Sequence, residues 1–136
     1  MRIDMKADAP RQPAVSVVVP CRNESDHIES CLRSILAQTP PPGYLEVIVA
    51  DGMSDDGTRE VLDNYAHIDG RLKIVDNPDK ITSEGLNKAI GAARAHCIWI
   101  MGANAQYGAE YLRDRLEVSE ASAADNVVGS MTCLGE

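Results

Sequence analysis

Apolar residues along this chain occur either in short continuous runs or at helical spacing. The first run, "VSVVVP" at residues 15–20, is β-branched and has no polar face. It therefore predicts a central strand that is covered on both sides. The next apolar positions follow the i, i+3, i+4, i+7 spacing of a helix with one buried stripe, namely Ile28, Cys31, Leu32, Ile35 and Leu36. The prolines of "TPPPG" end this helix.

Strand-like and helix-like segments alternate along the rest of the chain. "LEVIVA" predicts a second strand, "REVLDNYA" a helix, "LKIVDN" a third strand and "CIWIM" a fourth, buried strand. A further helix is expected from Ala109 to about Ser119, and Val127 and Val128 could start another strand. This alternation predicts an α/β fold with a mostly parallel sheet and helices on both faces, in a Rossmann-like arrangement.

The helices after the second and third strands also have one apolar face each. In "REVLDNYA" the inward positions are Val61, Leu62 and Tyr65, with Thr58 as the N-cap. In the helix before the fourth strand they are Leu86, Ala89, Ile90 and Ala93.

Three loops that follow predicted strands have an unusual polar content. They are "PCRNES" after the first strand, "ADGMSDDGT" after the second and "GANAQY" after the fourth. In parallel sheets ligands bind beyond the carboxyl ends of the strands, where neighbouring loops converge. We therefore expect a ligand site to be built from these loops.

The first loop has two interpretations. Arg22, Asn23 and Glu24 come just after a buried strand and just before a helix, where backbone N–H groups and the helix dipole favour an anion such as a phosphate. The alternative is structural: Asn23 or Ser25 caps the helix, and Glu24 suits its first turn.

The second loop contains three carboxylates, of which Asp51 stands at the strand end. There it could accept the imide N–H of a uracil-like base or the hydroxyls of a ribose. The remaining stretch, residues 55–58, is more simply a turn and helix cap. The D-x-D-x-D-G spacing of a calcium loop is absent, so that kind of site is excluded.

Length and charge narrow the classes of function. The chain has 136 residues, about one domain, which is short for an enzyme that binds two substrates. Its 13 basic and 21 acidic residues give a net charge of −8 without a basic cluster, which excludes nucleic acid as a partner. The four cysteines are widely spaced and are expected to be reduced thiols.

Targeting and cofactor motifs are missing from the sequence. Residues 1–14 predict a flexible leader without a signal peptide, and no run of about 18 apolar residues predicts a membrane span, so a cytoplasmic protein is expected. G-x-G-x-x-G after the first strand, G-x-x-x-x-G-K-S/T and G-x-S-x-G are all absent. A dehydrogenase, a P-loop NTPase and a nucleotidyltransferase with a glycine-rich phosphate loop therefore lose their sequence support.

Taken in order, these segments resemble the nucleotide-binding half of a family 2 glycosyltransferase of the GT-A fold. "VSVVVPCRNESDHIESCLRSILAQ" is similar to that family's opening strand, P-x-x-N-E loop and first helix, and "LEVIVADGMSDDGTREVL" to its second strand and D-x-x-S-x-D-G-T turn. "ITSEGLNKAIGAARAHCIWIMGANAQY" is similar to the helix and strand that lead into the metal site. The resemblance covers residues 15–130. The Asp-Gly-x-Ser turn and the spacing of Tyr107 and Tyr111 point to the bacterial exopolysaccharide branch.

This resemblance implies roles for particular residues. Those that hold the nucleoside would be Pro20, Arg22, Glu24 and Asp51, and those nearer the pyrophosphate would be Asn87 and Lys88. Family members hold Mg²⁺ or Mn²⁺ against the donor diphosphate in the loop after the fourth strand. Gly102 and Asn104 occupy the metal-loop positions here, where the family has Asp and then His or Asp. Hard cations prefer charged oxygen ligands, so we expect either that metal binding is weak or that other groups neutralise the diphosphate.

By the same resemblance, residues 15–136 form the nucleotide-sugar-binding part of the domain, without the acceptor half and its catalytic base. The leading hypothesis is a domain that binds a nucleotide-diphosphate sugar for transfer to a polysaccharide or lipid-linked acceptor, cytoplasmic or at the membrane periphery. The alternative is a truncated or non-catalytic nucleotide-binding module. An incomplete domain would leave apolar surface uncovered, so self-association is also expected.

Overall fold

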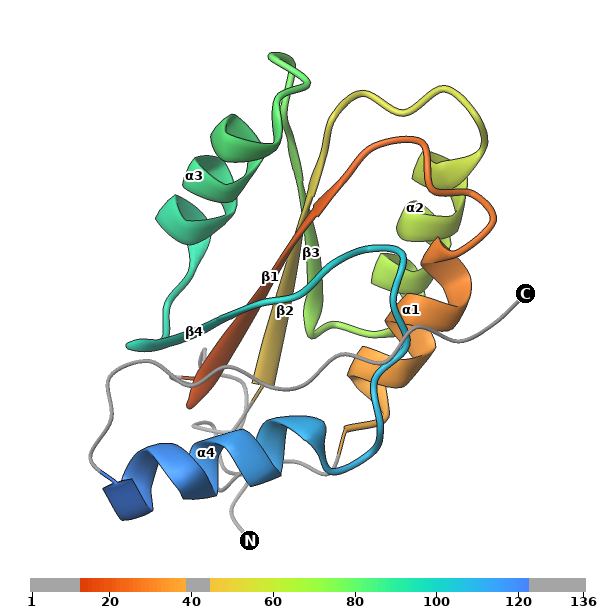
Figure 1. The fold of residues 1–136 in the computed structure, drawn as a ribbon. Helices are drawn as coiled ribbons and strands as arrows, with labels where there is room; N and C mark the ends of the chain where they lie inside the picture. The colour runs from red at the N-terminus through yellow and green to blue at the C-terminus, as the bar shows by residue number, and fades with distance from the viewer. Residues whose placement is uncertain (1–12, 39–44, 123–136) are drawn as a thin grey trace, which may run out of the picture.

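The computed structural model describes residues 13–38 and 45–122. Strands and helices alternate along the chain, as Figure 1 shows. The strands are β1 (Val15–Cys21), β2 (Leu45–Asp51), β3 (Leu72–Asp76) and β4 (Cys97–Ile100). The helices are α1 (Ile28–Leu36), α2 (Thr58–Ile68), α3 (Thr82–Ala92) and α4 (Tyr111–Ser122).

All strand pairs in this sheet are parallel, and the strand order is β3-β2-β1-β4. β1 lies between β2 and β4, and all but one of its residues are buried, which confirms the predicted central strand. The order reverses at β1, where the chain crosses from β3 to β4. At the carboxyl edge, Cys21, Asp51 and Asp76 stand in one row across neighbouring strands.

Helices cover both faces of the sheet, as predicted for an α/β fold. α3 packs on one face, where Ala89 contacts the inward residues Val18, Ile48 and Ala50. α1 and α2 pack on the other face, on the far side of the sheet from α3 in Figure 1. α4 joins this second core through the buried Leu112. The two cores fix the positions from which the loops leave the sheet.

The helix predictions are confirmed with two corrections. In α1 the buried positions are Ile28, Cys31, Leu32 and Ile35, as the spacing predicted. Thr58 does not cap α2 but is its first helical residue, and Gly57 is the N-cap with a left-handed φ of 101°. On α3, Ile90 is 39% exposed rather than inward, because the face toward the sheet is formed by Gly85 and Ala89.

The prediction of a buried fourth strand is wrong. β4 pairs only with β1 among the described residues, which makes it an edge of the described sheet. Its residues alternate, so that Cys97 and Trp99 pack against the core while Ile98 and Ile100 are exposed, the latter at 59%. An apolar run alone does not show whether both faces of a strand are covered.

Some expectations concern the ends of the chain. Pro13 is buried and Ala14 packs against the core, so the described structure starts before Val15. The expected strand at Val127 and Val128 lies outside the described residues.

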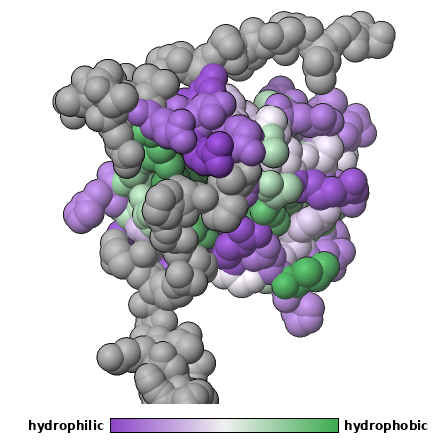
Figure 2. Space-filling view, turned by 90° about the horizontal axis from the view of Figure 1, so that it is seen from below, coloured by the Kyte–Doolittle hydropathy of each residue, from purple (hydrophilic) through white to green (hydrophobic). Residues whose placement is uncertain are grey.

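On the face opposite the carboxyl ends of the strands, hydrophilic side chains predominate, with hydrophobic ones between them (Figure 2). Within the described residues, no helix has both the length and the apolar character that crossing a membrane requires.

Candidate functional site

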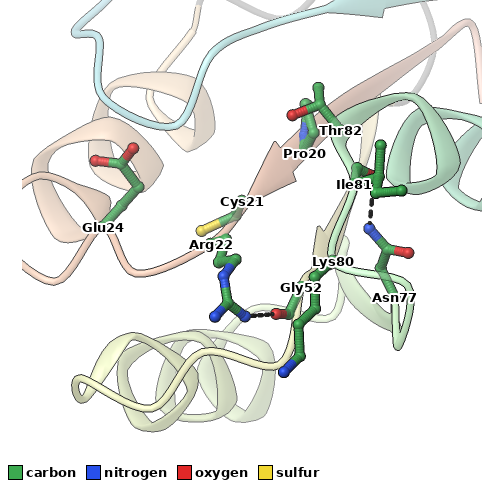
Figure 3. A pocket seen from close by; sticks show the side chains of 9 residues that line it. All are labelled: Pro20, Cys21, Arg22, Glu24, Gly52, Asn77, Lys80, Ile81 and Thr82. Atoms are coloured by element: carbon green, nitrogen blue, oxygen red, sulfur yellow. Dashed lines mark hydrogen bonds between the residues drawn. The ribbon is translucent and has the colours of Figure 1, made fainter.

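A small cavity of about 190 Å³ lies at the carboxyl edge of the sheet. Its walls come from the end of β1, the start of the loop after β2, and the segment that joins β3 to α3 (Figure 3). The lining residues are Pro20, Cys21, Arg22, Glu24, Gly52, Asn77, Lys80, Ile81 and Thr82. Three predicted site residues, Pro20, Arg22 and Glu24, are therefore brought together here.

The loops after β1 and β2 are joined by hydrogen bonds between residues about thirty positions apart, and they run beside each other in Figure 1. Three successive amides of the first loop donate to side chains of the second: Asn23 N to Ser54 Oγ (2.9 Å), Glu24 N to Thr58 Oγ1 (2.9 Å) and Ser25 N to Asp56 Oδ2 (3.2 Å). These N–H groups already have acceptors. A phosphate near this loop stays a prediction, and in this structure these three amides are not available to bind it.

The structural interpretation of the first loop is also wrong. α1 begins at Ile28, its N-cap is His27, and no side chain caps it. The Asn23 side chain instead accepts a hydrogen bond from the amide of Asp55 (2.9 Å) in the neighbouring loop. Asn23 thus fixes one loop to the other.

Asp56 holds the start of α2 and the first loop together. Its carboxylate accepts from the hydroxyl (2.5 Å) and amide (3.0 Å) of Thr58 and from the amide of Ser25. The hydrogen bond from the Thr58 hydroxyl is the main reason why the pKa of Asp56 is lowered to about 2. The turn predicted for residues 55–58 is therefore present, whereas the N-cap of α2 is Gly57 and no side chain caps this helix.

Asp51, the predicted partner of the base, is 1% exposed and does not line the cavity. One carboxylate oxygen accepts from the Ser54 hydroxyl (2.6 Å) and amide (3.3 Å), and the other lies 3.3 Å from the Arg59 guanidinium. Arg59 also pairs with Asp76 at 2.6 Å. In this arrangement Asp51 holds the turn that carries Gly52, and Gly52 does line the cavity.

Two cationic side chains line the cavity. Arg22 donates hydrogen bonds to the carbonyl oxygens of Gly52 (2.5 Å) and Met53 (3.4 Å). In Figure 3 the side chain of Arg22 extends towards the same side of the pocket as that of Lys80. The basic residues that form ion pairs within the described part of the chain are Arg33, Arg59, Arg71, Lys73, Arg94 and Arg113. Arg22 and Lys80 are not among them, so neither forms an ion pair with a described carboxylate, although Glu24 lines the same cavity.

Backbone strain is concentrated in the same loops. Within the described residues, Asn23, Met53 and Lys80 are the non-glycine residues with positive φ, at 52°, 60° and 63°. One follows each of β1, β2 and β3. Such conformations cost free energy and cluster at ligand sites, where the surrounding structure holds them in place.

The segment after β3 was missed by the sequence analysis, which considered only the loops after the first, second and fourth strands. Asn77 is buried there, and its amide side chain donates to the carbonyl of Ile81 (2.9 Å). Its backbone N–H donates to the carbonyl of Asp51 (2.8 Å), which ties this segment to the end of β2. The same topological rule, applied to "DNPDK" after the third predicted strand, would have found it.

Asn87 and Lys88 lie on α3 as predicted, but both are exposed and neither lines the cavity. The structure therefore does not bring them together with Arg22 and Glu24. Their proposed place near a pyrophosphate stays a prediction.

The loop after β4 is held firmly against α1. The Tyr107 hydroxyl accepts from the amide of Gly102 (2.8 Å) and donates to its carbonyl (3.3 Å), and the Cys31 thiol donates to that same carbonyl (3.3 Å). Tyr107 and Tyr111 pack with their ring centroids 5.1 Å apart. This tyrosine pair therefore fixes the position of Gly102.

The residues of this loop do not fit a divalent cation. Gly102 has no side chain and its carbonyl oxygen already accepts two hydrogen bonds, while Asn104 offers one neutral amide oxygen. Burial raises the pKa of the nearby Cys31 to about 11, so this thiol stays protonated near neutral pH. Within residues 13–38 and 45–122, no group of three or more His, Cys, Asp or Glu side chains could hold a metal ion.

The sequence of this chain matches one family model and several curated proteins. The model of Glycosyl transferase family 2 matches residues 16–133. The succinoglycan biosynthesis protein ExoA of Rhizobium meliloti (strain 1021) is 34% identical over 134 residues, which is 96% of this chain and 40% of ExoA. TuaG of Bacillus subtilis (strain 168) is 32% identical over 87% of this chain and 47% of its own. The chain thus spans less than half the length of these curated relatives.

Two solved structures have the same fold. The mannosyltransferase PcManGT of Pyrobaculum calidifontis, in complex with GDP-Man and Mn²⁺, superposes with a TM-score of 0.69 and 32% identity over 92% of this chain and 36% of its own. S. aureus TarS in complex with UDP superposes with a TM-score of 0.70 and 24% identity over 82% of this chain and 33% of its own. With the fold of these enzymes and a family match over most of its length, the chain belongs to glycosyl transferase family 2 and has the GT-A fold.

Proposed function

We propose that this chain binds a nucleoside-diphosphate sugar and that the cavity at the carboxyl edge receives the nucleoside. The observation that carries the proposal is the meeting of Pro20, Arg22 and Glu24 with Lys80 around one cavity. At about 190 Å³ it is smaller than the ~300–1,000 Å³ of sites that enclose a drug-sized ligand. It would therefore take only part of the donor, and the sugar would extend outside.

Two relatives of known structure support this choice of ligand. PcManGT was solved with GDP-Man and TarS with UDP. We extend this ligand class to the present chain, as the donor for transfer of a sugar to a saccharide or lipid-linked acceptor. UDP and GDP are therefore the first nucleotides to test.

A second candidate is a non-catalytic nucleotide-binding module. It is favoured by one observation, that Gly102 and Asn104 leave the stretch "GANAQY" after β4 without a carboxylate. Both candidates predict nucleotide binding. Only a transferase would also release UDP or GDP from a nucleotide sugar, so a donor-hydrolysis assay separates them.

Blocking the cavity should abolish most of the binding. Thr82 is exposed in the first turn of α3 and lines the cavity. Thr82→Trp should weaken the affinity for UDP or GDP by about tenfold or more, a loss of ~1.4 kcal/mol or more, because the indole would occupy the nucleoside's space. Calorimetric titration measures this effect.

The matched control is Ser83→Trp, at the next position, which is also exposed but does not line the cavity. It should bind as the wild type does. Equal affinities for wild type and Thr82→Trp would place the nucleotide elsewhere and refute the proposal.

A further inference from the structure

The loop after β4 and the cavity differ in the charge of their side chains. "GANAQY" has no anionic ligand for a cation, whereas the cavity is lined by two cations, Arg22 and Lys80, and by one carboxylate, Glu24, with which neither cation forms an ion pair. In a chain with a net charge of −8, an incoming diphosphate is repelled at long range. Positive charge close to the site is therefore needed to hold it.

We infer that this chain binds the diphosphate of its nucleotide without a divalent cation in the loop after β4, and that Arg22 and Lys80 supply the positive charge. The inference rests on the proposed function and describes how the same site works. In this respect the chain would differ from PcManGT, whose solved structure contains GDP-Man together with Mn²⁺.

Arg22 is suited to this task by its position. The carbonyl oxygens of Gly52 and Met53 hold one end of its guanidinium, so part of the cost of ordering the side chain is already met before a ligand arrives. A guanidinium also offers several N–H donors in one plane, which match the oxygens of a phosphate.

Lys80 is suited in a different way. It is exposed, its left-handed backbone sets the direction of its side chain, and its ammonium group has no hydrogen bond or ion pair within the described residues. A strained lysine without a partner at the rim of a cavity is expected where it serves a ligand. The two cations come from different loops, so they can contact a diphosphate from two directions.

The first test needs no variant. Affinities for UDP and GDP are measured by calorimetry with excess EDTA and again with Mn²⁺, after correction for the Mn²⁺ complex of the nucleotide in water. The two affinities should agree within about threefold. Binding that requires Mn²⁺ would overturn the inference but leave the proposed function standing, whereas failure to bind either nucleotide in both conditions would refute both.

The second test removes the cations. Arg22→Gln with Lys80→Gln should weaken binding in EDTA by about tenfold or more, the scale of lost charge-assisted hydrogen bonds. Arg33→Gln with Arg113→Gln removes two basic charges from exposed ion pairs on α1 and at the start of α4, and controls for the overall charge. An unchanged affinity in the double variant, with its melting temperature also unchanged, would contradict the role of these cations.

The third test restores the carboxylates as Gly102→Asp with Asn104→Asp. A Cβ at Gly102 would lie 3.5 Å from Asn104 Oδ1 and 3.9 Å from the Tyr107 hydroxyl, which are ordinary contacts, so the loop has room. Mn²⁺ should then strengthen nucleotide binding by about an order of magnitude. Equal dependence on Mn²⁺ in the restored and unmodified chains would show that this loop does not decide metal use, against the inference.

Discussion

Replacing Glu46 by alanine should lower the free energy of unfolding by about 2–4 kcal/mol. Glu46 is 1% exposed and accepts hydrogen bonds from the Ser16 hydroxyl (2.5 Å) and from the amide (2.7 Å) and guanidinium (3.2 Å) of Arg94. Lys73 lies 3.5 Å away. This loss of stability is near the lower end of the range for a broken buried ion pair. The reason is that Arg94 and Lys73 are partly exposed, so water can solvate their charges once Glu46 is removed.

Urea unfolding at neutral pH measures this loss. Glu29→Ala, which breaks an exposed ion pair with Arg33 on α1, is the matched control and should cost far less. If the two variants were equally stable, Glu46 would not be the link between β1, β2 and the segment before β4.

The effect of Glu46 should also depend on pH. Burial alone would raise the pKa of this carboxyl, but the hydrogen bonds from Ser16 and Arg94 and the charge of Lys73 hold it below its ordinary value of 4.5. A carboxyl of this kind stabilises the fold fully above its unfolded pKa and loses that contribution as the pH falls through its folded pKa. The difference between wild type and Glu46→Ala should therefore shrink below about pH 4.5.

Replacing Asp51 by alanine should have the second largest effect on stability, about 1–3 kcal/mol, because the Ser54 hydroxyl and amide lose a buried acceptor. The turn that carries Gly52 loses its anchor at the same time, and Gly52 in turn holds Arg22. We therefore expect nucleotide affinity to fall by about tenfold as well.

The pattern of that loss distinguishes two roles for Asp51. If it acts by positioning the turn, UDP and GDP should lose affinity by the same factor, and Ser54→Ala should reproduce part of the loss. If it contacts the base directly, as the family resemblance predicts, the loss should fall mainly on one nucleotide and Ser54→Ala should have little effect. Its bonds to Ser54 and Arg59 favour the positioning role.

The order of elements and the parallel sheet could be predicted because the apolar patterns are strong. "VSVVVP" has no polar face, and it is the buried centre of the sheet. The same reasoning was wrong for β4, because an apolar run does not reveal which neighbouring strands are present. Ile90 was placed inward by its spacing, although small residues, Gly85 and Ala89, form the face that packs closely on the sheet.

The site could be predicted only in part. The rule that loops converge at the carboxyl ends of parallel strands pointed to the loop with Arg22 and Glu24, and the family resemblance added Pro20; all three line the cavity. The bonds between the loops could not be predicted, because each joins residues about thirty positions apart and depends on the register of β1 and β2. Those hydrogen bonds use the backbone amides that the sequence suggested for a phosphate. The Asp51 carboxylate is in the same way already bonded to Ser54 and Arg59.

A nucleoside diphosphate that binds at the carboxyl-edge cavity should perturb the backbone amides that line it. The most direct test is a titration of the ¹⁵N-labelled chain with UDP and with GDP, followed by amide chemical shifts. We expect shifts of the cavity-lining amides, at residues 21, 22, 24, 52, 77 and 80–82, and no change at the opposite edge around Glu46 and Arg94. Shifts confined to that opposite edge, or none at saturating nucleotide, would contradict it.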